Sequence, residues 1–455
     1  MQLLFTVLLA LTLVIALLCS VENGIHMIAF FLVMVFCQNL IAILFHPYIP
    51  PSYNTLFSLT KELMLYGALA LDVMRYGRLK LDKYNWLTAV FLAVYLAVSV
   101  YNLLVTPAGL QAAVIALRYT LLPVLCLYVG RRLHISQRDA RRLPRMLVAF
   151  SLCLALAGLV EVFCLGNDFW QKIGYGDYAV KVKGNVAYSL RDGVTVNFYT
   201  WDFGIIPLRR LVSVTADPLA TAYLLFLGLL LLFTGAVSRK DVRGKRLYYA
   251  AAAVIVTVAC ALCLSKAIFL LAGIAFVLGA FYRKMIPKEF FQVGIVACGV
   301  IMAFGLGYYL ENSAILTSSV KHLMGLVYGF RAGGLLGGGL GTAGSTALML
   351  TGTWTEVSES YIGGTVAQLG FVGLLAFIGF MGMQILRLMR LYRMYRSGFT
   401  LFAIFFCIGN FVCMLFSDSS VSMMGTGLYY VLIGLAQQDR IYTRRLRYDY
   451  HQDTL

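Results

Sequence analysis

The chain has 455 residues, of which 61% are hydrophobic and 13% are charged. Soluble globular proteins contain about 45–50% apolar and about 25% charged residues, so this composition excludes that class and indicates a protein embedded in a membrane. The formal net charge of +17 suggests a nucleic-acid partner at first sight, but the positions of the basic residues exclude it.

Apolar runs of about 18–23 residues recur along the chain, and each is long enough to cross a bilayer as a helix. Membrane β-barrel strands are excluded, because they alternate apolar and polar residues over about 10 positions. The sequence predicts an all-α polytopic membrane protein, a single domain over 1–455 with about 12–13 transmembrane helices. We place these helices at 2–20, 25–45, 54–74, 85–106, 111–130, 146–166, 213–235, 248–264, 266–282, 290–310, 361–384, 399–417 and 422–437. Since no basic residues precede the first run, we expect a membrane helix there rather than a secretory signal.

Basic residues cluster in short segments at every second connection between the predicted helices. The segments are 75–83, 131–145, 239–246, 283–288, 387–396 and 440–447, and they hold most of the 37 lysines and arginines. Because cytoplasmic loops of membrane proteins are enriched in Lys and Arg, this pattern predicts that these segments face the cytoplasm. The charge therefore indicates topology and contact with anionic lipid, not a nucleic-acid footprint.

Two long connections are predicted on the opposite, extracytoplasmic side. The first, at 167–210, is rich in aromatic residues, which could stack on sugar rings, although we favour ordinary packing within the loop. The second, at 311–360, contains the glycine-rich stretch "GFRAGGLLGGGLGTAGS" (329–345). Non-helical backbone is tolerated at membrane depth only where it is buried in protein or lines a cavity. Because glycine permits close backbone approaches, we expect this stretch to fold over a ligand at the membrane surface.

Several basic residues fall on this extracytoplasmic side, where the positive-inside rule disfavours them. They are Lys172, Lys181, Lys183, Arg191, Arg209, Arg210, Lys266, Lys321 and Arg331. For the first four we favour solvation or contact with lipid headgroups, which is common for basic residues near helix ends. The other five indicate a site that needs positive charge. The planar fork of arginine suits phosphate oxygens, and several cations around one cavity suit a diphosphate.

Acidic residues and a histidine near the same side are candidates for a general base. Glu356 and Glu359 precede the predicted helix at 361–384, and His322 lies in the second long connection. Beside a bound diphosphate, a carboxylate or imidazole could take the proton of an attacking hydroxyl. The alternatives are that Glu359 is a residue favoured at a helix N-terminus by the macrodipole, and that His322 is simply solvated.

Ionisable residues also occur inside the predicted helix at 54–74. They are Lys61, Glu62 and Asp72. Such residues are candidates for function by default, but they fit a transporter as well as an enzyme. The ten cysteines are scattered singly, without the spacing of a metal site or a disulfide framework, so we expect neither a metal nor another cofactor.

Four segments resemble motifs of the O-antigen ligase/polymerase superfamily, and they occur in that family's order. "RLVSVTADPLATAYLL" (210–225) is similar to the family's Arg-x-x-Gly-x-x-x-Asn-Pro segment, and "LSKAIFLLAG" (264–273) is similar to its Ser-Arg-Gly helix start. "LLGGGLGTAGS" (335–345) is similar to its glycine-rich segment, and "ESYIGGTVAQLGFVGLLAF" (359–377) is similar to the helix that ends in Leu-Gly-x-x-Gly-Leu. The resemblance covers roughly 200–385, nearly half of the chain.

The resemblance implies an integral membrane glycosyltransferase of the GT-C type that works, without a metal, on the outer face of the bacterial inner membrane. It implies a donor glycan linked to undecaprenyl diphosphate, with the lipid held by a helical bundle and the diphosphate by loop arginines. A flippase and a chain-length regulator are the partner proteins that it implies. Residue by residue, Arg210 falls on the first family arginine and Lys266 on the second, while Glu359 falls where ligases carry a histidine.

The sequence departs from the family pattern at some of these positions. Lys266 keeps a positive charge but loses the bidentate geometry of arginine. Ser213 stands in place of a glycine, and Asp217 stands in place of an asparagine. The glutamate at position 359, in place of the ligases' histidine, favours a polymerase over a ligase.

Our interpretation is a polymerase that joins undecaprenyl-diphosphate-linked repeat units, as donor and acceptor, into exopolysaccharide, capsule or O-antigen on the periplasmic face. The candidates for the diphosphate site are Arg210, Lys266, Arg209, Arg331 and Lys321, and those for the base are Glu359 and His322. One alternative is a ligase that transfers glycan to lipid A core or protein. Another is a transporter of polysaccharide or lipid-linked sugar, which would favour internal repeats and mid-span polar residues. Here the distinctive polar residues gather in the outer connections instead.

Overall fold

A computed structural model describes residues 2–22, 24–76, 86–182, 190–200, 207–282, 318–344 and 359–438. The predicted helix at 290–310 lies outside these residues, as do Lys183 and Glu356. Within them, regular structure is helical apart from two short antiparallel hairpins. The protein is therefore an all-α membrane protein, as the sequence predicts.

Most predicted transmembrane helices are found close to their predicted positions. Among the described residues, the helices long and apolar enough to cross a membrane are Gly24–Tyr48, Trp86–Leu104, Leu110–Arg132, Gln137–Lys172, Tyr361–Tyr395 and Asp418–Ala436. Shorter apolar helices are Gln2–Ala16, Pro218–Phe233, Arg246–Leu262, Lys266–Tyr282 and Gly398–Cys413. Each overlaps a predicted helix, because the long apolar run that a bilayer requires is itself the sequence signal.

In chain order, the described elements are helices and short strands. The longer helices are α1 (Gln2–Glu22), α2 (Gly24–Phe45), α4 (Thr60–Tyr76), α5 (Trp86–Leu104), α6 (Leu110–Arg132), α7 (Gln137–Val160), α10 (Pro218–Phe233), α12 (Arg246–Leu262), α13 (Lys266–Tyr282), α15 (Ser318–Ala332), α17 (Tyr361–Tyr395) and α18 (Gly398–Cys413). The shorter helices are α3 (Pro51–Ser58), α8 (Gly166–Lys172), α9 (Tyr175–Lys181), α11 (Arg239–Gly244) and α19 (Leu428–Ala436). The strands are β1 (Leu190–Arg191), β2 (Val194–Thr195), β3 (Tyr199–Thr200) and β4 (Leu208–Arg209).

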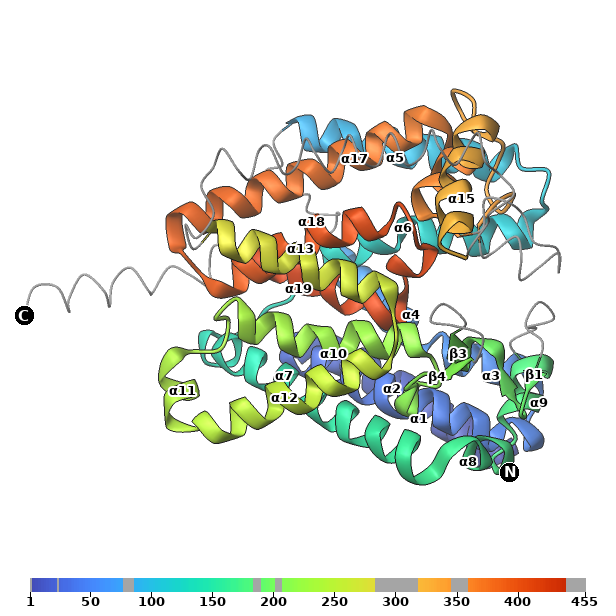
Figure 1. The fold of residues 1–455 in the computed structure, drawn as a ribbon. Helices are drawn as coiled ribbons and strands as arrows, with labels where there is room; N and C mark the ends of the chain where they lie inside the picture. Colours follow the sequence, from blue (N-terminus) through green and yellow to red (C-terminus); the bar gives the residue numbers. More distant parts are fainter. Residues whose placement is uncertain are drawn as a thin grey trace, which may run out of the picture.

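The long helices run between two ends of the molecule (Figure 1). Helices α17 and α5 lie along one side, α7 and α12 lie along the other, and α10, α13, α18 and α19 lie between them. One end carries α8, α9, both hairpins and α15, and we call it the hairpin end. The opposite end carries α11, and we call it the basic end.

The basic segments that the structure describes meet at the basic end. Arg145, which belongs to the segment 131–145, pairs with Asp241 of α11 at 3.3 Å. The turn between α17 and α18 packs at Gly398 against Gly235, just before α11. The side chain of Gln438 donates to the carbonyl of Gly130 at 2.8 Å and so joins the end of α19 to the end of α6. Three segments that are distant in sequence therefore form one positively charged end.

The structure corrects the prediction of one helix at 54–74: this part of the chain forms two helices, α3 and α4, separated at Leu59. The hydroxyl of Thr60 donates to the carbonyl of Phe57 at 2.7 Å across this break. Two charged residues of α4 have partners on other helices: Lys61 donates to the Gln38 side chain, and Glu62 pairs with Arg118 at 3.2 Å. In the hydropathy pattern these polar residues fall inside one transmembrane helix. In the structure they lie just after the break between two helices and contact other helices.

The described parts of the first long connection, predicted at 167–210, are folded. They contain α8, α9 and the two hairpins, and their large aromatic side chains share one core with residues of α1, α2 and α3, such as Phe5 and Phe57. Trp170 and Phe198 are at most 1% exposed, and their rings pack edge-to-face with centroids 5.6 Å apart. These aromatic residues are therefore packed in the protein, as we expected, and part of their packing is against the first helices.

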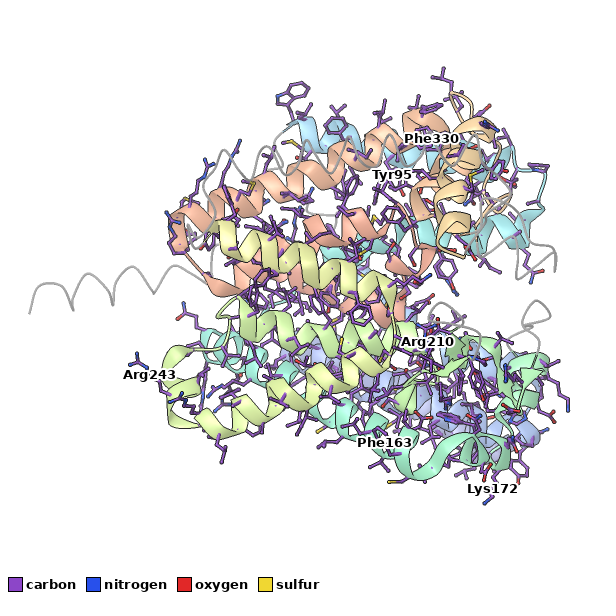
Figure 2. All side chains as sticks on the ribbon, in the orientation of Figure 1. Tyr95, Phe163, Lys172, Arg210, Arg243 and Phe330 are labelled. Atoms are coloured by element: carbon purple, nitrogen blue, oxygen red, sulfur yellow. The ribbon has the colours of Figure 1, made fainter. Side chains whose placement is uncertain are left out.

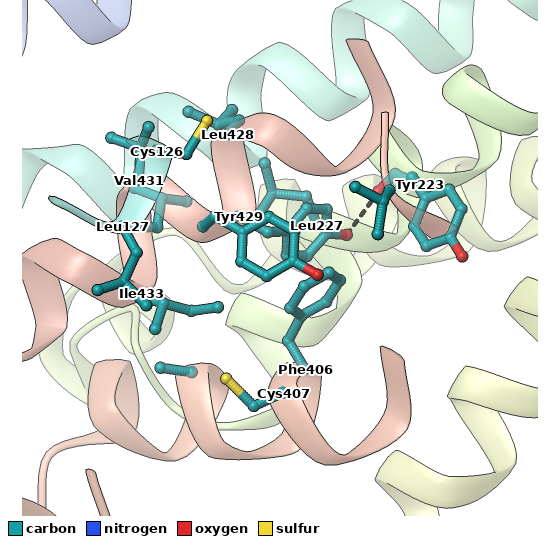
Figure 3. Close-up of a cluster of buried hydrophobic side chains, with 14 of the residues drawn as sticks. Cys126, Leu127, Tyr223, Leu227, Phe406, Cys407, Leu428, Tyr429, Val431 and Ile433 are labelled. Carbon is teal, nitrogen blue, oxygen red and sulfur yellow. Dashed lines mark hydrogen bonds between the residues drawn. The ribbon is translucent and has the colours of Figure 1, made fainter. Parts of the chain in front are cut away.

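The centre of the molecule is a tightly packed contact between α6, α10, α18 and α19 (Figure 3). The rings of Phe406 and Tyr429 stack with centroids 3.8 Å apart, and the Tyr429 hydroxyl donates to the backbone carbonyl of Tyr223 at 2.5 Å. Glycines bring α6 and α19 together: a Cβ added at Gly434 would overlap the Leu127 carbonyl, and one added at Gly130 would overlap the Val431 carbonyl. Small residues are the usual means of close helix packing in membranes.

Replacement of one of these glycines tests the close contact. We expect Gly434→Ala to force α6 and α19 apart and to lower stability by about 1–3 kcal/mol, the range for overpacking a core. Thermal unfolding of the detergent-solubilised protein, followed by circular dichroism, measures the effect. The matched control is Gly382→Ala in α17, where an added Cβ meets nothing within 4 Å. Equal melting temperatures for the two variants would contradict the packing described.

Candidate functional site

The segment before α10 is fixed to the rest of the hairpin end by a buried ion pair. A guanidinium nitrogen of Arg209 lies 2.5 Å from a carboxylate oxygen of Glu161, which is 3% exposed. Glu161 belongs to a single π-helical turn, Glu161–Leu165, that continues α7. Its carboxylate also accepts from the indole nitrogen of Trp170 at 2.8 Å. Arg209 donates in addition to the Asn167 side chain at 2.8 Å, so protein groups surround this arginine.

The neighbouring strand is held by the same anchor. Tyr199 of β3 pairs with Arg209 of β4, and its phenol donates to the Asp192 carboxylate at 2.9 Å. Partial burial raises the pKa of Tyr199, and the hydrogen bond to Asp192 raises it further. The phenol therefore keeps its proton to a higher pH than a free tyrosine does, and it links β3 to the turn between β1 and β2.

Arg210 faces a different part of the molecule. Its side chain donates from Nε to the carbonyl of Cys263 at 2.9 Å, and its backbone N–H donates to the Phe198 carbonyl at 2.8 Å. The next residue, Leu211, donates to the Leu262 carbonyl at 2.9 Å. These bonds hold Arg210 against the turn between α12 and α13, from which Lys266 begins α13. Figure 2 shows Arg210 at the hairpin end of α10.

The backbone around Arg210 and Lys266 is strained. Ser213, Ala216 and Leu264 have φ of 50°, 53° and 48°, a left-handed conformation that is unfavourable for residues with a side chain. Such residues concentrate at functional sites, where the surrounding structure maintains them. Ser213 stands where the resembled family has glycine, the residue that adopts this conformation most easily. We call the region of Arg210, 213–217 and 264–266 the cationic junction.

The cationic junction is completed by a helix cap and a buried hydroxyl. Asp217 is the N-cap of α10, and its carboxylate accepts from the backbone N–H of Leu219 at 2.9 Å and of Ala220 at 3.3 Å. Ser265 is 1% exposed, and its hydroxyl has no hydrogen-bond partner among the described residues. Because a buried polar group without a partner is unfavourable, this hydroxyl marks a place where a further polar group would fit.

Glu359 lies just before α17. The start of α17 contacts the end of α18, and the end of α18 contacts α13, whose first residue is Lys266. Ser360 caps α17 by accepting from the Gly363 N–H at 3.0 Å, and Glu359 precedes it with a partly exposed side chain. The N–H of Ile362 donates to the Met414 carbonyl at 3.1 Å. The thiol of Cys413 donates to the Ala267 carbonyl at 3.3 Å. The end of α18 is therefore in contact with α13 on one side and with α17 on the other.

A small polar pocket opens between α6, the glycine-rich stretch, the start of α17 and the segment after α18. Its polar lining includes Tyr119 and Thr120 from α6, Thr365 and Gln368 from α17, and Asp418. Gln368 is held in place because its Oε1 accepts from the Gly341 N–H at 2.7 Å. We call this cavity the polar pocket.

The glycine-rich stretch is packed into the protein in part: 339–341 and 343–344 are buried, whereas 334–336 are exposed. Helix α17 is interrupted at Gly370, whose φ is 69°, and the freed N–H groups of Phe371 and Val372 donate to the carbonyls of Gly334 and Leu335 at 3.2 Å. On the other side, the Asn102 amide donates to the Leu336 carbonyl at 2.7 Å. The glycines thus permit close contact with α5, α6 and the break in α17, and the predicted contact of this stretch with a ligand stays a prediction.

Arg331 is exposed at the end of α15, and Figure 2 shows its neighbour Phe330 near the top of the view, away from Arg210 at the hairpin end of α10. Lys321 and His322 belong to α15, but their side chains lie outside the described residues. Lys172 and Lys181 are exposed, as expected of solvated residues.

Three residues of the site were missed in the sequence. Glu161 could have been found, because it is an ionisable residue near the end of the predicted helix at 146–166. Asp418 and Gln368 carry no comparable signal, since one lies in a short polar turn and the other on an otherwise apolar helix. In the part of the chain that the structure describes, no three His, Cys, Asp or Glu side chains are grouped as metal ligands.

No protein-family model matches the chain, and no curated protein matches it significantly.

The buried ion pair predicts a large loss of stability when one partner is removed. Glu161→Gln leaves the charge of Arg209 without its partner, and breaking a buried pair in this way costs about 3–5 kcal/mol. The melting temperature of the purified protein is the measurement. Asp177→Asn, which removes the carboxylate of the exposed pair with Lys181 at 3.0 Å, is the control and should leave the melting temperature nearly unchanged. A melting temperature as high for Glu161→Gln as for the control would refute the anchoring role.

The glycine-rich stretch yields a second prediction. Gly337 and Gly334 both have positive φ, but a Cβ added at Gly337 would overlap the Gln368 carbonyl, whereas one at Gly334 meets nothing within 4 Å. Ala at either position incurs a conformational cost of about 1–2 kcal/mol. We expect Gly337→Ala to be destabilised by about 1–3 kcal/mol more than Gly334→Ala, because only the first adds a steric overlap. Parallel thermal unfolding of the two variants measures the difference. Equal losses would mean that the stretch does not pack into α17 as described.

Proposed function

We propose that the protein is a bacterial polysaccharide polymerase that joins oligosaccharide repeat units carried on undecaprenyl diphosphate, at the periplasmic face of the inner membrane. The observation that carries this proposal is the cationic junction, which holds Arg210 and the start of α13, with Lys266, together on strained backbone. The junction lies at the hairpin end, opposite the end where the basic segments gather. Because Lys and Arg are enriched in cytoplasmic loops, which we predict at the basic end, this rule does not account for the positive charge at the hairpin end.

The chemistry of the junction suits a diphosphate. Arg210 is half-buried and oriented by its bond to the Cys263 carbonyl, so its guanidinium is presented at little further entropic cost. Lys266 adds a second cation, three residues after the Cys263 carbonyl that Arg210 binds, and the buried Ser265 hydroxyl precedes it in the same turn. The nearby carboxylate of Glu161 is already paired with Arg209. Preorganised cations at a site of developing negative charge are a large contribution to catalysis.

The proposed reaction is a single inverting displacement. The oxygen of an acceptor hydroxyl attacks the anomeric carbon of the donor sugar, and a new C–O bond forms as the bond from that carbon to the diphosphate oxygen breaks. The electron pair of the broken bond stays on the diphosphate, whose charge Arg210 and Lys266 stabilise. The hydroxyl proton passes to Glu359, with His322 as the alternative base. Arg209 acts by positioning the strand, because its own side chain is bound to Glu161.

A transporter of lipid-linked sugar is the second candidate, and one observation favours it. Lys61 and Glu62 are buried at 6% and 8% exposure within α4, and ionisable residues inside a membrane often line a transport path. These charges are compensated within the protein by Gln38 and Arg118, so they support transport less than the cationic junction supports transfer.

The activity assay uses the protein in nanodiscs with the undecaprenyl-diphosphate-linked repeat unit of its own host, and the products are separated on a gel. We expect a ladder of longer glycans without added metal. Arg210→Ala and Lys266→Ala should each reduce the rate by about 10²–10³-fold, the effect of removing one preorganised charge-stabilising group. Lys266→Arg should retain most of the activity, because it keeps the charge. The control is Lys172→Ala, an exposed lysine at the same end.

The outcomes separate the candidate functions. A ladder that persists in Arg210→Ala would show that the cationic junction is not required for the reaction. Transfer only to added lipid A core or protein would identify a ligase, and movement of lipid-linked sugar across a sealed vesicle without transfer would identify a transporter. Loss of activity in His322→Ala with full activity in Glu359→Gln would assign the base to the histidine.

A further inference from the structure

The polar pocket has no part in the diphosphate chemistry, yet it lies close to Glu359. It is lined by residues from four segments that are distant in sequence: α6, the end of the glycine-rich stretch, the first turns of α17 and Asp418 after α18. Ser360, which follows Glu359, is one of its lining residues and is 1% exposed. The proposed base therefore stands beside the pocket, one residue before its wall.

The lining suits a neutral, hydroxyl-rich ligand. It combines one carboxylate, one amide, several hydroxyls and the rings of Tyr119 and Tyr361. No lysine, arginine or histidine is among the described residues that line it. Arg118 stacks on the ring of Tyr119, with its guanidinium 4.8 Å from the ring centre, and it is paired with Glu62. The pocket thus lacks the uncompensated cations that an anionic group would require.

Two of the polar groups of the pocket lie beside glycines. The Oε1 of Gln368 accepts from the Gly341 N–H at 2.7 Å, which fixes the position of its amide. Two glycines, Gly344 and Gly364, form the facing wall: a Cβ added at either would lie 3.8–3.9 Å from the Nε2 of Gln368. At Gly344 the added Cβ would also lie 4.0 Å from a carboxylate oxygen of Asp418. The Gln368 amide and the Asp418 carboxylate therefore both lie next to the space that a side chain at Gly344 would occupy.

We propose that the polar pocket binds a neutral sugar, the acceptor sugar of the lipid-linked repeat unit, through the Gln368 amide and the Asp418 carboxylate. This proposal rests on the proposed polymerase function. It places the acceptor hydroxyl beside Glu359, while the donor diphosphate occupies the cationic junction. The two sites flank the end of α18, where Cys413 contacts α13 and Met414 contacts α17. A pocket built to hydrogen-bond hydroxyls discriminates strongly against ligands that lack them.

The test uses a probe that lacks the lipid and the diphosphate: the repeat-unit oligosaccharide released from the host's lipid carrier by mild acid. Its binding to the protein in nanodiscs is measured by isothermal titration calorimetry. We expect Gly364→Ala to weaken binding at least tenfold, because its methyl group enters the gap at ordinary contact distances, 3.9 Å from Gln368 and Gly344, and leaves the fold intact. Asp418→Asn should weaken binding similarly, because it replaces the charged carboxylate that accepts hydrogen bonds from the sugar hydroxyls with a neutral amide. Gly382→Ala, in the same helix, should bind as the unmodified protein does.

Arg210→Ala separates this proposal from the proposed function. It should lose the glycan ladder and still bind the released oligosaccharide, because the diphosphate is absent from the probe. Binding that is unchanged in both pocket variants, or no binding by a protein that forms the ladder, would overturn the pocket proposal and leave the polymerase standing. Binding that depends on the pocket, without any ladder, would overturn the polymerase and retain the pocket as a sugar site. If neither binding nor a ladder is found, both proposals fail.

Discussion

The hydrocarbon core of a bilayer offers no hydrogen-bond partner, so wherever this chain leaves helical structure the protein itself must satisfy the backbone. The carbonyls of the glycine-rich stretch accept the N–H groups that the break at Gly370 sets free. Before α10, the carboxylate of Glu161 accepts from the Val212 N–H at 3.4 Å and holds Arg209 as well. Both irregular segments lie at the hairpin end and depend on such contacts, and the candidate site is built on them.

The fold was largely predictable, because the apolar run that spans a membrane is the pattern that a sequence displays most directly. The helix predicted at 266–282 matches α13, Lys266–Tyr282, since Lys266 marks its start and an uninterrupted apolar run follows. The prediction of one helix at 54–74 was wrong, because the chain forms two helices separated at Leu59; the polar residues just after this break are compensated by Gln38 and Arg118 of other helices. Hydropathy averages one segment and carries no information on its neighbours.

The site was predictable only in part. Charge on the disfavoured side indicated both Arg209 and Arg210, but adjacent residues of a strand point in opposite directions. One arginine therefore reaches Glu161, and the other reaches the turn after α12. The polar pocket left no sequence signal, because its residues come from four segments and its open space depends on the absence of side chains at Gly344 and Gly364.

An enzyme that joins two copies of the same kind of molecule must hold them in different ways. In the proposed polymerase, donor and acceptor are both sugars on a lipid diphosphate, so recognition of the sugar or of the lipid alone cannot assign their roles. Under this proposal the cationic junction would select a diphosphate through Arg210 and Lys266, while the polar pocket, whose described lining lacks cations, would favour a neutral ring. A repeat unit bound by its diphosphate would then be the donor, and one bound by its distal sugar would be the acceptor. Since the end of α18 contacts the helices that carry both proposed sites, its position would set the distance across which the glycosyl group passes.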